Sequence, residues 1–100
     1  MLERLTFETV KELQGTSFWV YPEPDHKVEL RLVAAAKVME SEAARLPRTP
    51  FSAYFLGPPS YALTQGAFPM THAQFPEPFF LFIVPVESTP DGLLYEAVFT

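Results

Sequence analysis

The sequence predicts a single domain over residues 1–100 that is mainly β: a small antiparallel sandwich or barrel of about six strands with a short N-terminal helix. Short segments rich in aromatic and β-branched residues recur along the chain, and Pro- or Gly-containing turn signals separate them. Hydrophobic residues make up 48% of the chain, which is enough for one core. A chain of 100 residues leaves no room for a second core.

The first element predicted is a short amphipathic helix over residues 7–14. Thr6 is a suitable N-cap residue, and Phe7, Val10 and Leu13 recur at helical spacing. A helix this short is not stable alone, so we expect its apolar stripe to pack against the rest of the domain.

The next segments are predicted strands, although one of them is ambiguous. Residues 17–21 form an aromatic strand that ends at a Pro-rich turn. Residues 28–39 have a helix-favouring composition, but their period-2 alternation favours a strand with a bend near residues 34–36. This alternation places one set of side chains on one face, namely Val28, Leu30, Leu32, Ala34, Ala36 and Val38, and a charged set on the other, namely Glu29, Arg31 and Lys37.

Four further strands follow in the second half of the chain. They are predicted over residues 51–56, 67–71, 79–84 and 93–99. The intervening irregular segments are a loop over residues 41–50, a turn at Gln65-Gly66, a Pro-rich break at residues 76–78 and a turn at residues 89–92.

Composition excludes several classes of protein. A net charge of −5 without clustered Lys or Arg argues against nucleic-acid binding. The longest apolar run, residues 79–86, is far shorter than the roughly 20 residues of a membrane helix. Cysteine is absent, which excludes disulfides and thiolate chemistry, and the first residues do not resemble a secretion signal. We therefore expect a cytoplasmic protein.

The two histidines are the only candidates for a metal site. His26 and His72 lie in or beside predicted turns, and Asp25 or Glu77 would complete a mixed nitrogen and oxygen ligand set. Two exposed loop histidines are the favoured interpretation, so we expect neither a metal nor another cofactor.

Catalytic motifs are absent: the sequence has no H-E-x-x-H, no G-x-S-x-G and no phosphate-binding glycine loop. Ser60 follows Gly57-Pro58-Pro59, but no histidine is placed by sequence to activate it. Glu40 and Glu42 lie in a charged stretch that is typical of a solvated loop. We expect no enzyme activity, with a hydrolase as the least favoured alternative.

A small-ligand-binding barrel is the second hypothesis. It rests on Trp19, Tyr21, Tyr54 and Tyr61, which would form an aromatic platform if the fold brought them together. The competing interpretation is that these side chains simply belong to the core.

The leading hypothesis is a non-catalytic interaction or assembly module, and it rests on residues 79–84, which are apolar on both faces. One face belongs to the core, and the other must be covered by the N-terminal helix or by another protein molecule. The last strand has no charged residue after Glu96 to protect a free sheet edge. The interface predicted for self-association or for a protein partner comprises Phe80, Phe82, Val84, Val98 and Phe99.

The chain resembles a family of small bacterial domains of unknown function along nearly its whole length. The segments that carry the resemblance are Leu5-Thr6-Phe7, Val28-Glu29-Leu30-Arg31-Leu32, Pro50-Phe51-Ser52, Gln65-Gly66, Phe82-Ile83-Val84-Pro85-Val86 and Tyr95-Glu96-Ala97-Val98-Phe99. The resemblance implies the fold and the domain extent, and it supplies no catalytic residue. Because genes of this family occur near those of phage-tail-like proteins, it also implies an accessory role in such an assembly.

Overall fold

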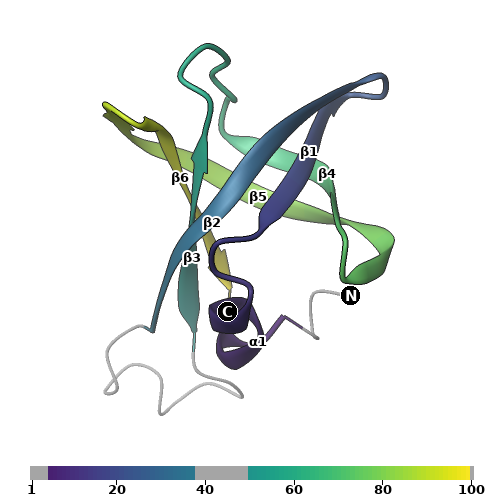
Figure 1. Ribbon diagram of the computed structural model, residues 1–100, viewed down its shortest axis with the longest axis vertical. Coiled ribbons are helices and arrows are strands. Elements are labelled where there is room, and N and C mark those ends of the chain that lie inside the picture. Colours follow the sequence, from purple (N-terminus) through teal and green to yellow (C-terminus); the bar gives the residue numbers. More distant parts are fainter. Residues whose placement is uncertain (1–4, 38–49, 100) are drawn as a thin grey trace.

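The computed structural model describes residues 5–37 and 50–99, and these residues form one short helix and six antiparallel strands (Figure 1). The elements are α1 (Phe7–Glu12), β1 (Ser17–Glu23), β2 (His26–Lys37), β3 (Phe51–Gly57), β4 (Gly66–His72), β5 (Phe75–Thr89) and β6 (Gly92–Phe99). The mainly β fold with a short N-terminal helix is thus confirmed. No helix in the described ranges is long and apolar enough to cross a membrane.

The strands close into a barrel in the order β1-β2-β3-β6-β5-β4. The barrel consists of two three-stranded meanders, β1 to β3 and β4 to β6. Pairing of β1 with β4 joins them on one side, and pairing of β3 with β6 joins them on the other. Strands β3 and β6 pair from Phe51↔Phe99 to Gly57↔Leu93, whereas β1 and β4 pair only from Phe18↔His72 to Val20↔Met70. The loop predicted over residues 41–50 lies, except for Pro50, outside the described residues.

Aromatic side chains fill the interior of the barrel. The rings of Phe18 and Phe55 meet edge to face at 5.1 Å between centroids, and Tyr95 is fully buried beside them in the same core. The Tyr95 hydroxyl accepts a hydrogen bond from the backbone N–H of Leu63 at 2.8 Å. Burying several such rings supplies the apolar area that a domain of this size needs for stability.

Helix α1 lies at one end of the barrel, as Figure 1 shows. The side chain of Thr6 accepts a hydrogen bond from the backbone N–H of Thr9 at 3.2 Å, which confirms it as the N-cap. Val10 and Leu13 are buried in the core, and the ring of Phe7 packs against Phe51 at 5.9 Å. The apolar stripe of the helix therefore closes the end of the barrel.

Strand β2 confirms the strand predicted over residues 28–39 as far as Lys37, and residues 38 and 39 lie outside the described ranges. The predicted bend is a register shift between Leu32 and Ala34. The shift changes which side chains face inward, so Ala35 packs against the core and Ala36 is exposed. The predicted inward position of Ala36 is therefore wrong.

Strand β5 is much longer than predicted, and the predicted break at residues 76–78 is wrong. The strand continues through Pro76, Pro78 and Pro85. It pairs first with β4 and then with β6, and the pairing register shifts near both of its Pro-containing ends. Prolines are tolerated where a ladder needs no N–H. The first half of β5 pairs with β4 and the second half with β6.

Candidate functional site

The outer face of β5 carries two exposed aromatic side chains. Phe80 is 64% exposed and Phe82 is 51% exposed, while the alternating residues Phe79, Leu81 and Ile83 are buried. Helix α1 packs on the barrel end and leaves the outer face of β5 uncovered. The interpretation in which this helix covers the second face is therefore wrong.

Strand β4 extends this apolar surface. Pro69 lies opposite Phe80, and Ala67 lies opposite Phe82. Directly opposite residues of an antiparallel pair share a face of the sheet. We name these four residues, Ala67, Pro69, Phe80 and Phe82, the β4–β5 face.

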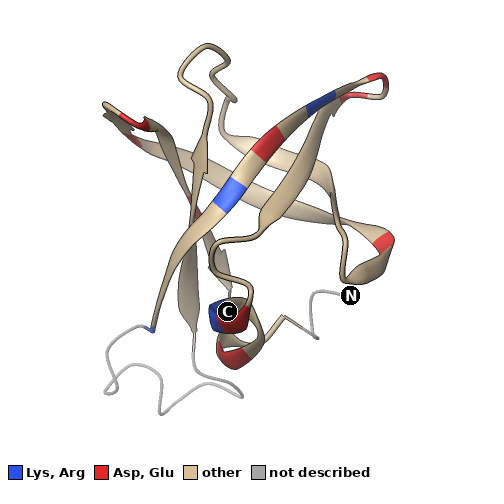
Figure 2. Ribbon diagram, viewed as in Figure 1, with Lys and Arg blue, Asp and Glu red and all other residues tan. Residues whose placement is uncertain are grey.

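The β4–β5 face is free of charge, and acidic residues flank it. Neither β4 nor residues 78–86 contain Asp, Glu, Lys or Arg, whereas Glu77 and Glu87 stand at the two ends of that run. Figure 2 shows this as a tan ribbon along β4 and the middle of β5. The surface therefore combines an apolar centre with an acidic margin.

A groove adjoins this face where β1 and β4 stop pairing. It has a volume of about 580 Å³, and it is lined by Tyr21, Pro22, Glu23 and Pro24 on one side and by β4 and Pro78 on the other. The Tyr21 hydroxyl lies 3.2 Å from Thr71 Oγ1, and Thr71 pairs with Trp19 at the end of the groove where β1 and β4 still meet. Pro69 belongs both to this β1–β4 groove and to the β4–β5 face, so the two surfaces are continuous.

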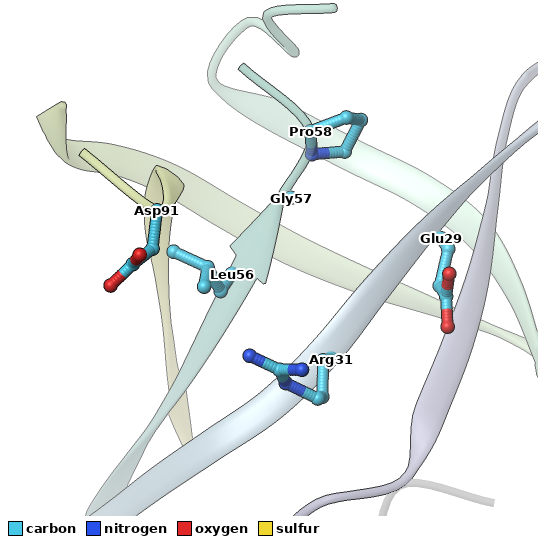
Figure 3. Close-up of a pocket in the computed structure, with 6 residues that line it drawn as sticks. All are labelled: Glu29, Arg31, Leu56, Gly57, Pro58 and Asp91. Atoms are coloured by element: carbon cyan, nitrogen blue, oxygen red, sulfur yellow. The ribbon is translucent and has the colours of Figure 1, made fainter. Parts of the chain in front are cut away.

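A second hollow, of about 380 Å³, has three charged residues, Glu29, Arg31 and Asp91, among the six that line it (Figure 3). Glu29 and Asp91 lie on opposite sides of Arg31, and within the described residues neither carboxylate forms an ion pair with it. Glu29 instead accepts a hydrogen bond from Ser17. These groups do not converge on one point, so the hollow offers no pair of groups for acid and base catalysis.

The structure corrects the prediction that both histidines are exposed loop residues. His26 is exposed, and its ring lies 5.0 Å from that of Tyr61. His72, by contrast, is the last residue of β4 and is only 5% exposed, because its ring points into the barrel against Phe18 and Phe75. Within the described ranges, no three His, Asp or Glu side chains gather in a way that would hold a metal ion.

Hydrogen bonds to both ring nitrogens define the tautomer of His72. Its Nδ1 accepts from the backbone N–H of Gln74 at 3.0 Å, so the neutral ring carries its proton on Nε2. Nε2 donates to Thr16 Oγ1 at 2.9 Å, and the Thr16 hydroxyl donates to the carbonyl of Leu13 at 2.5 Å. Burial lowers the pKa of His72. The ring thus joins β4 to the C-terminal end of α1 in its neutral form.

The predicted interface residues do not all lie on one surface. Phe80 and Phe82 belong to the β4–β5 face, and Val84 is half-buried opposite Glu96. Val98 is 57% exposed, but it lies on β6 opposite Ser52. Phe99 is 5% exposed, because its ring stacks on Phe51 at 4.6 Å. Strand β6 pairs with both β3 and β5, so it is not a sheet edge and the missing charge after Glu96 gives no support to an interface there.

The predicted aromatic platform is also dispersed. Trp19 and Tyr21 lie on β1, where the Lys27 ammonium stands 4.6 Å from the Trp19 ring. Tyr54 lies on β3, two strands away in the barrel, and its hydroxyl donates to Glu96 at 3.2 Å. Tyr61 packs against His26 instead. The barrel therefore does not assemble these four side chains into one site.

The other sequence candidates add no catalytic group. Ser60 is exposed in the segment after β3, and Glu40 and Glu42 lie outside the described residues. The sequence reasoning missed the groove, and the one signal for it is a set of four prolines in three segments of the chain, Pro22 with Pro24, Pro69, and Pro78. Pro22, Pro24 and Pro78 were assigned to turns and breaks, and Pro69 was placed inside the strand predicted over residues 67–71.

Comparison with the curated proteins and with the solved structures gives no significant match. The model of one protein family, described as a domain of unknown function (DUF6916), matches residues 5–99. This agrees with the resemblance to a family of small domains of unknown function. Because the match covers the described barrel from Leu5 to the last strand, the chain belongs to the DUF6916 family.

Proposed function

We propose that the chain is a non-catalytic interaction module that docks a different protein on the β4–β5 face. The observation that carries the proposal is the exposure of Phe80 and Phe82 on an uncharged surface that nothing in the described chain covers. Contiguous exposed apolar surface on a small domain marks interaction sites. Burial of apolar area on docking contributes roughly 25 cal/mol per Å² to the free energy of association, before the opposing entropy.

Charge favours a different protein over a second copy of this chain. The net charge is −5, and Glu77 and Glu87 flank the β4–β5 face. A symmetric contact between two copies would bring these acidic margins together, which opposes association. The partner that fits is an apolar segment flanked by Lys or Arg.

The resemblance to small bacterial domains extends the proposal to a biological setting. It favours a cytoplasmic accessory role in a phage-tail-like assembly, and the resemblance alone supports that part. Co-purification with each tail-like protein encoded beside the gene tests it, with the double variant Phe80→Ser/Phe82→Ser as the control. Absence of a complex with any of these proteins would contradict the setting.

The alternative of a small-ligand-binding barrel has less support. Barrels of this kind hold ligands in their interior or mouth. Here the interior is occupied by Phe18, Phe55 and Tyr95, and α1 closes one end. An external apolar surface is better suited to a macromolecule.

A selection experiment tests the docking proposal without a known partner. A displayed library of random peptides is selected on the intact protein, and the enriched peptides are measured by calorimetry. We expect apolar segments flanked by Lys or Arg, with affinity at least about tenfold weaker for Phe80→Ser/Phe82→Ser. Val98→Ser is the matched control, because it removes an exposed apolar side chain from another strand. The proposal would be overturned if no peptides were enriched, or if Phe80→Ser/Phe82→Ser bound the enriched peptides with unchanged affinity.

A further inference from the structure

We propose that the β1–β4 groove binds a proline-containing segment of the partner in the polyproline II conformation, with a Lys or Arg beside it. This inference rests on the proposed function, because it specifies the part of a protein partner that the continuous surface receives. The backbone, the side chains and the charge of the groove each favour such a segment.

The backbone of the groove is unsuited to adding a strand. Beyond Val20↔Met70 the strands β1 and β4 no longer pair with each other, so a peptide between them would meet two strand edges. Pro22 and Pro69 lie at these edges and have no N–H to donate to a ladder. Prolines at an edge oppose strand addition. A polyproline II segment needs no such ladder, because its backbone makes no regular hydrogen bonds to a neighbour.

The side chains of the groove match the surface of a polyproline II segment. Pyrrolidine rings and the Tyr21 ring provide apolar walls, and Phe68 contributes to the lining between the strands. Proline-rich segments dock in aromatic-lined grooves of this kind. Only one hydroxyl proton is used in the contact between Tyr21 and Thr71, so the other remains to donate to a peptide carbonyl.

Charge determines the direction in which the segment lies. Glu23 lines the groove, and Asp25 follows in the adjoining hairpin turn. Within the described residues Glu23 has no Lys or Arg partner, since Lys27 stands over the Trp19 ring. A cation of the peptide therefore pairs with Glu23. Because Glu23 is exposed, the pair contributes mainly to orientation and only slightly to affinity.

The test uses synthetic peptides of one length that carry the pattern Pro-x-x-Pro next to Lys or Arg. Binding is followed by two-dimensional amide NMR of the labelled protein. We expect the amide signals of Tyr21, Phe68 and Thr71 to shift. Peptides with alanine in place of both prolines should bind at least about tenfold more weakly. Equal binding of the alanine peptides, or no shift at these residues, would overturn the inference.

Matched variants locate the contact. Tyr21→Phe removes one hydroxyl from the groove while keeping the ring, and we expect about a threefold to tenfold loss of peptide affinity. Tyr54→Phe removes a hydroxyl from the outer face of β3 and should leave peptide affinity unchanged. Glu23→Gln should lower the affinity for Lys-containing peptides about twofold and leave the affinity for peptides without a cation unchanged. Equal losses for Tyr21→Phe and Tyr54→Phe would contradict the assignment.

The two proposals fail in distinguishable ways. If library peptides bind through Phe80 and Phe82 while proline peptides leave the groove signals unchanged, the docking function stands and the groove assignment is wrong. If proline peptides bind the groove and Phe80→Ser/Phe82→Ser binds every partner peptide normally, the β4–β5 face is the wrong docking site. If neither set binds, both proposals are wrong.

Discussion

The two faces of β5 carry nearly the same side chains and have opposite roles. Phe79, Leu81 and Ile83 point inward and are at most 4% exposed, whereas Phe80 and Phe82 between them remain in solvent. Barrel closure imposes this difference, because successive side chains of a strand point to opposite faces and only one face lines the core. Hydrophobicity of a strand therefore does not by itself distinguish residues that stabilise a fold from residues available for binding.

The largest effect that separates the two faces is expected from Ile83→Ala. Removing this fully buried side chain should lower the free energy of unfolding by about 2–5 kcal/mol, because the inner face loses packing and gains a cavity. Phe82→Ala, one residue earlier on the outer face, should lower it by about 1 kcal/mol or less, because half of this side chain is exposed. Urea unfolding of both variants measures the difference. Similar losses for both would show that the outer face also takes part in folding.

A smaller effect is expected at the end of the barrel. Thr6→Ala removes the N-cap of α1 and should lower the free energy of unfolding by about 1 kcal/mol. Because α1 packs on the core and not on the outer face of β5, peptide binding at Phe80 and Phe82 should not change. Thermal unfolding and calorimetry measure the two quantities, with Thr64→Ala, an exposed threonine outside the regular elements, as control. Altered peptide binding in Thr6→Ala would contradict this separation.

The pH dependence of stability reports on the inner face of β4. Burial lowers the pKa of His72 below the ordinary value of 6.5, so the unfolded chain binds this proton more readily than the folded chain. The contribution of neutral His72 to the free energy of unfolding is therefore complete above pH 6.5, and it is lost as the pH falls below that value. Protonation at Nδ1 would also break the hydrogen bond from Gln74.

Urea unfolding at about pH 7.5 and about pH 5.5 tests this linkage. We expect the wild-type chain to be less stable at the lower pH and His72→Gln to show a smaller difference. His26→Gln retains His72 and is the matched control. An identical pH dependence in His72→Gln and the wild-type chain would refute the role assigned to the buried ring.

The smallest stability effect is expected for Phe80→Ser. The change in unfolding free energy should be below about 0.5 kcal/mol, because the side chain is already in solvent in the folded chain. Retention on a hydrophobic-interaction column should nevertheless fall, since the β4–β5 face becomes more polar. A stability loss comparable to that of Ile83→Ala would mean that Phe80 is covered in solution.

Local patterns predict most of the fold. The N-cap at Thr6 and the alternation of Val28, Leu30 and Leu32 are physical signals confined to a few residues, and the structure confirms both elements. Pro76 and Pro78 were misleading because the effect of a proline depends on whether the ladder needs its N–H, which pairing decides. The register shift near Leu32 likewise depends on the partner strand.

The candidate site is less accessible to sequence reasoning. The outward direction of Phe80 and Phe82 follows from alternation, but their exposure depends on where α1 packs. Burial of His72 and Phe99 depends on barrel closure, and no local signal distinguishes them from exposed residues. The β1–β4 groove arises where two strands distant in sequence diverge, so its prolines are visible in the sequence but no local pattern shows that they meet.

The short pairing between β1 and β4 also affects how the barrel fluctuates. These strands pair over Phe18 to Val20 only, whereas β3 and β6 pair along their whole facing length. Partial opening requires least free energy where the fewest backbone hydrogen bonds and contacts are broken. Amide hydrogens along the β1–β4 ladder are therefore expected to exchange with solvent sooner than those between β3 and β6. Such an opening widens the β1–β4 groove, so a ligand bound across both strands would slow amide exchange along the β1–β4 ladder.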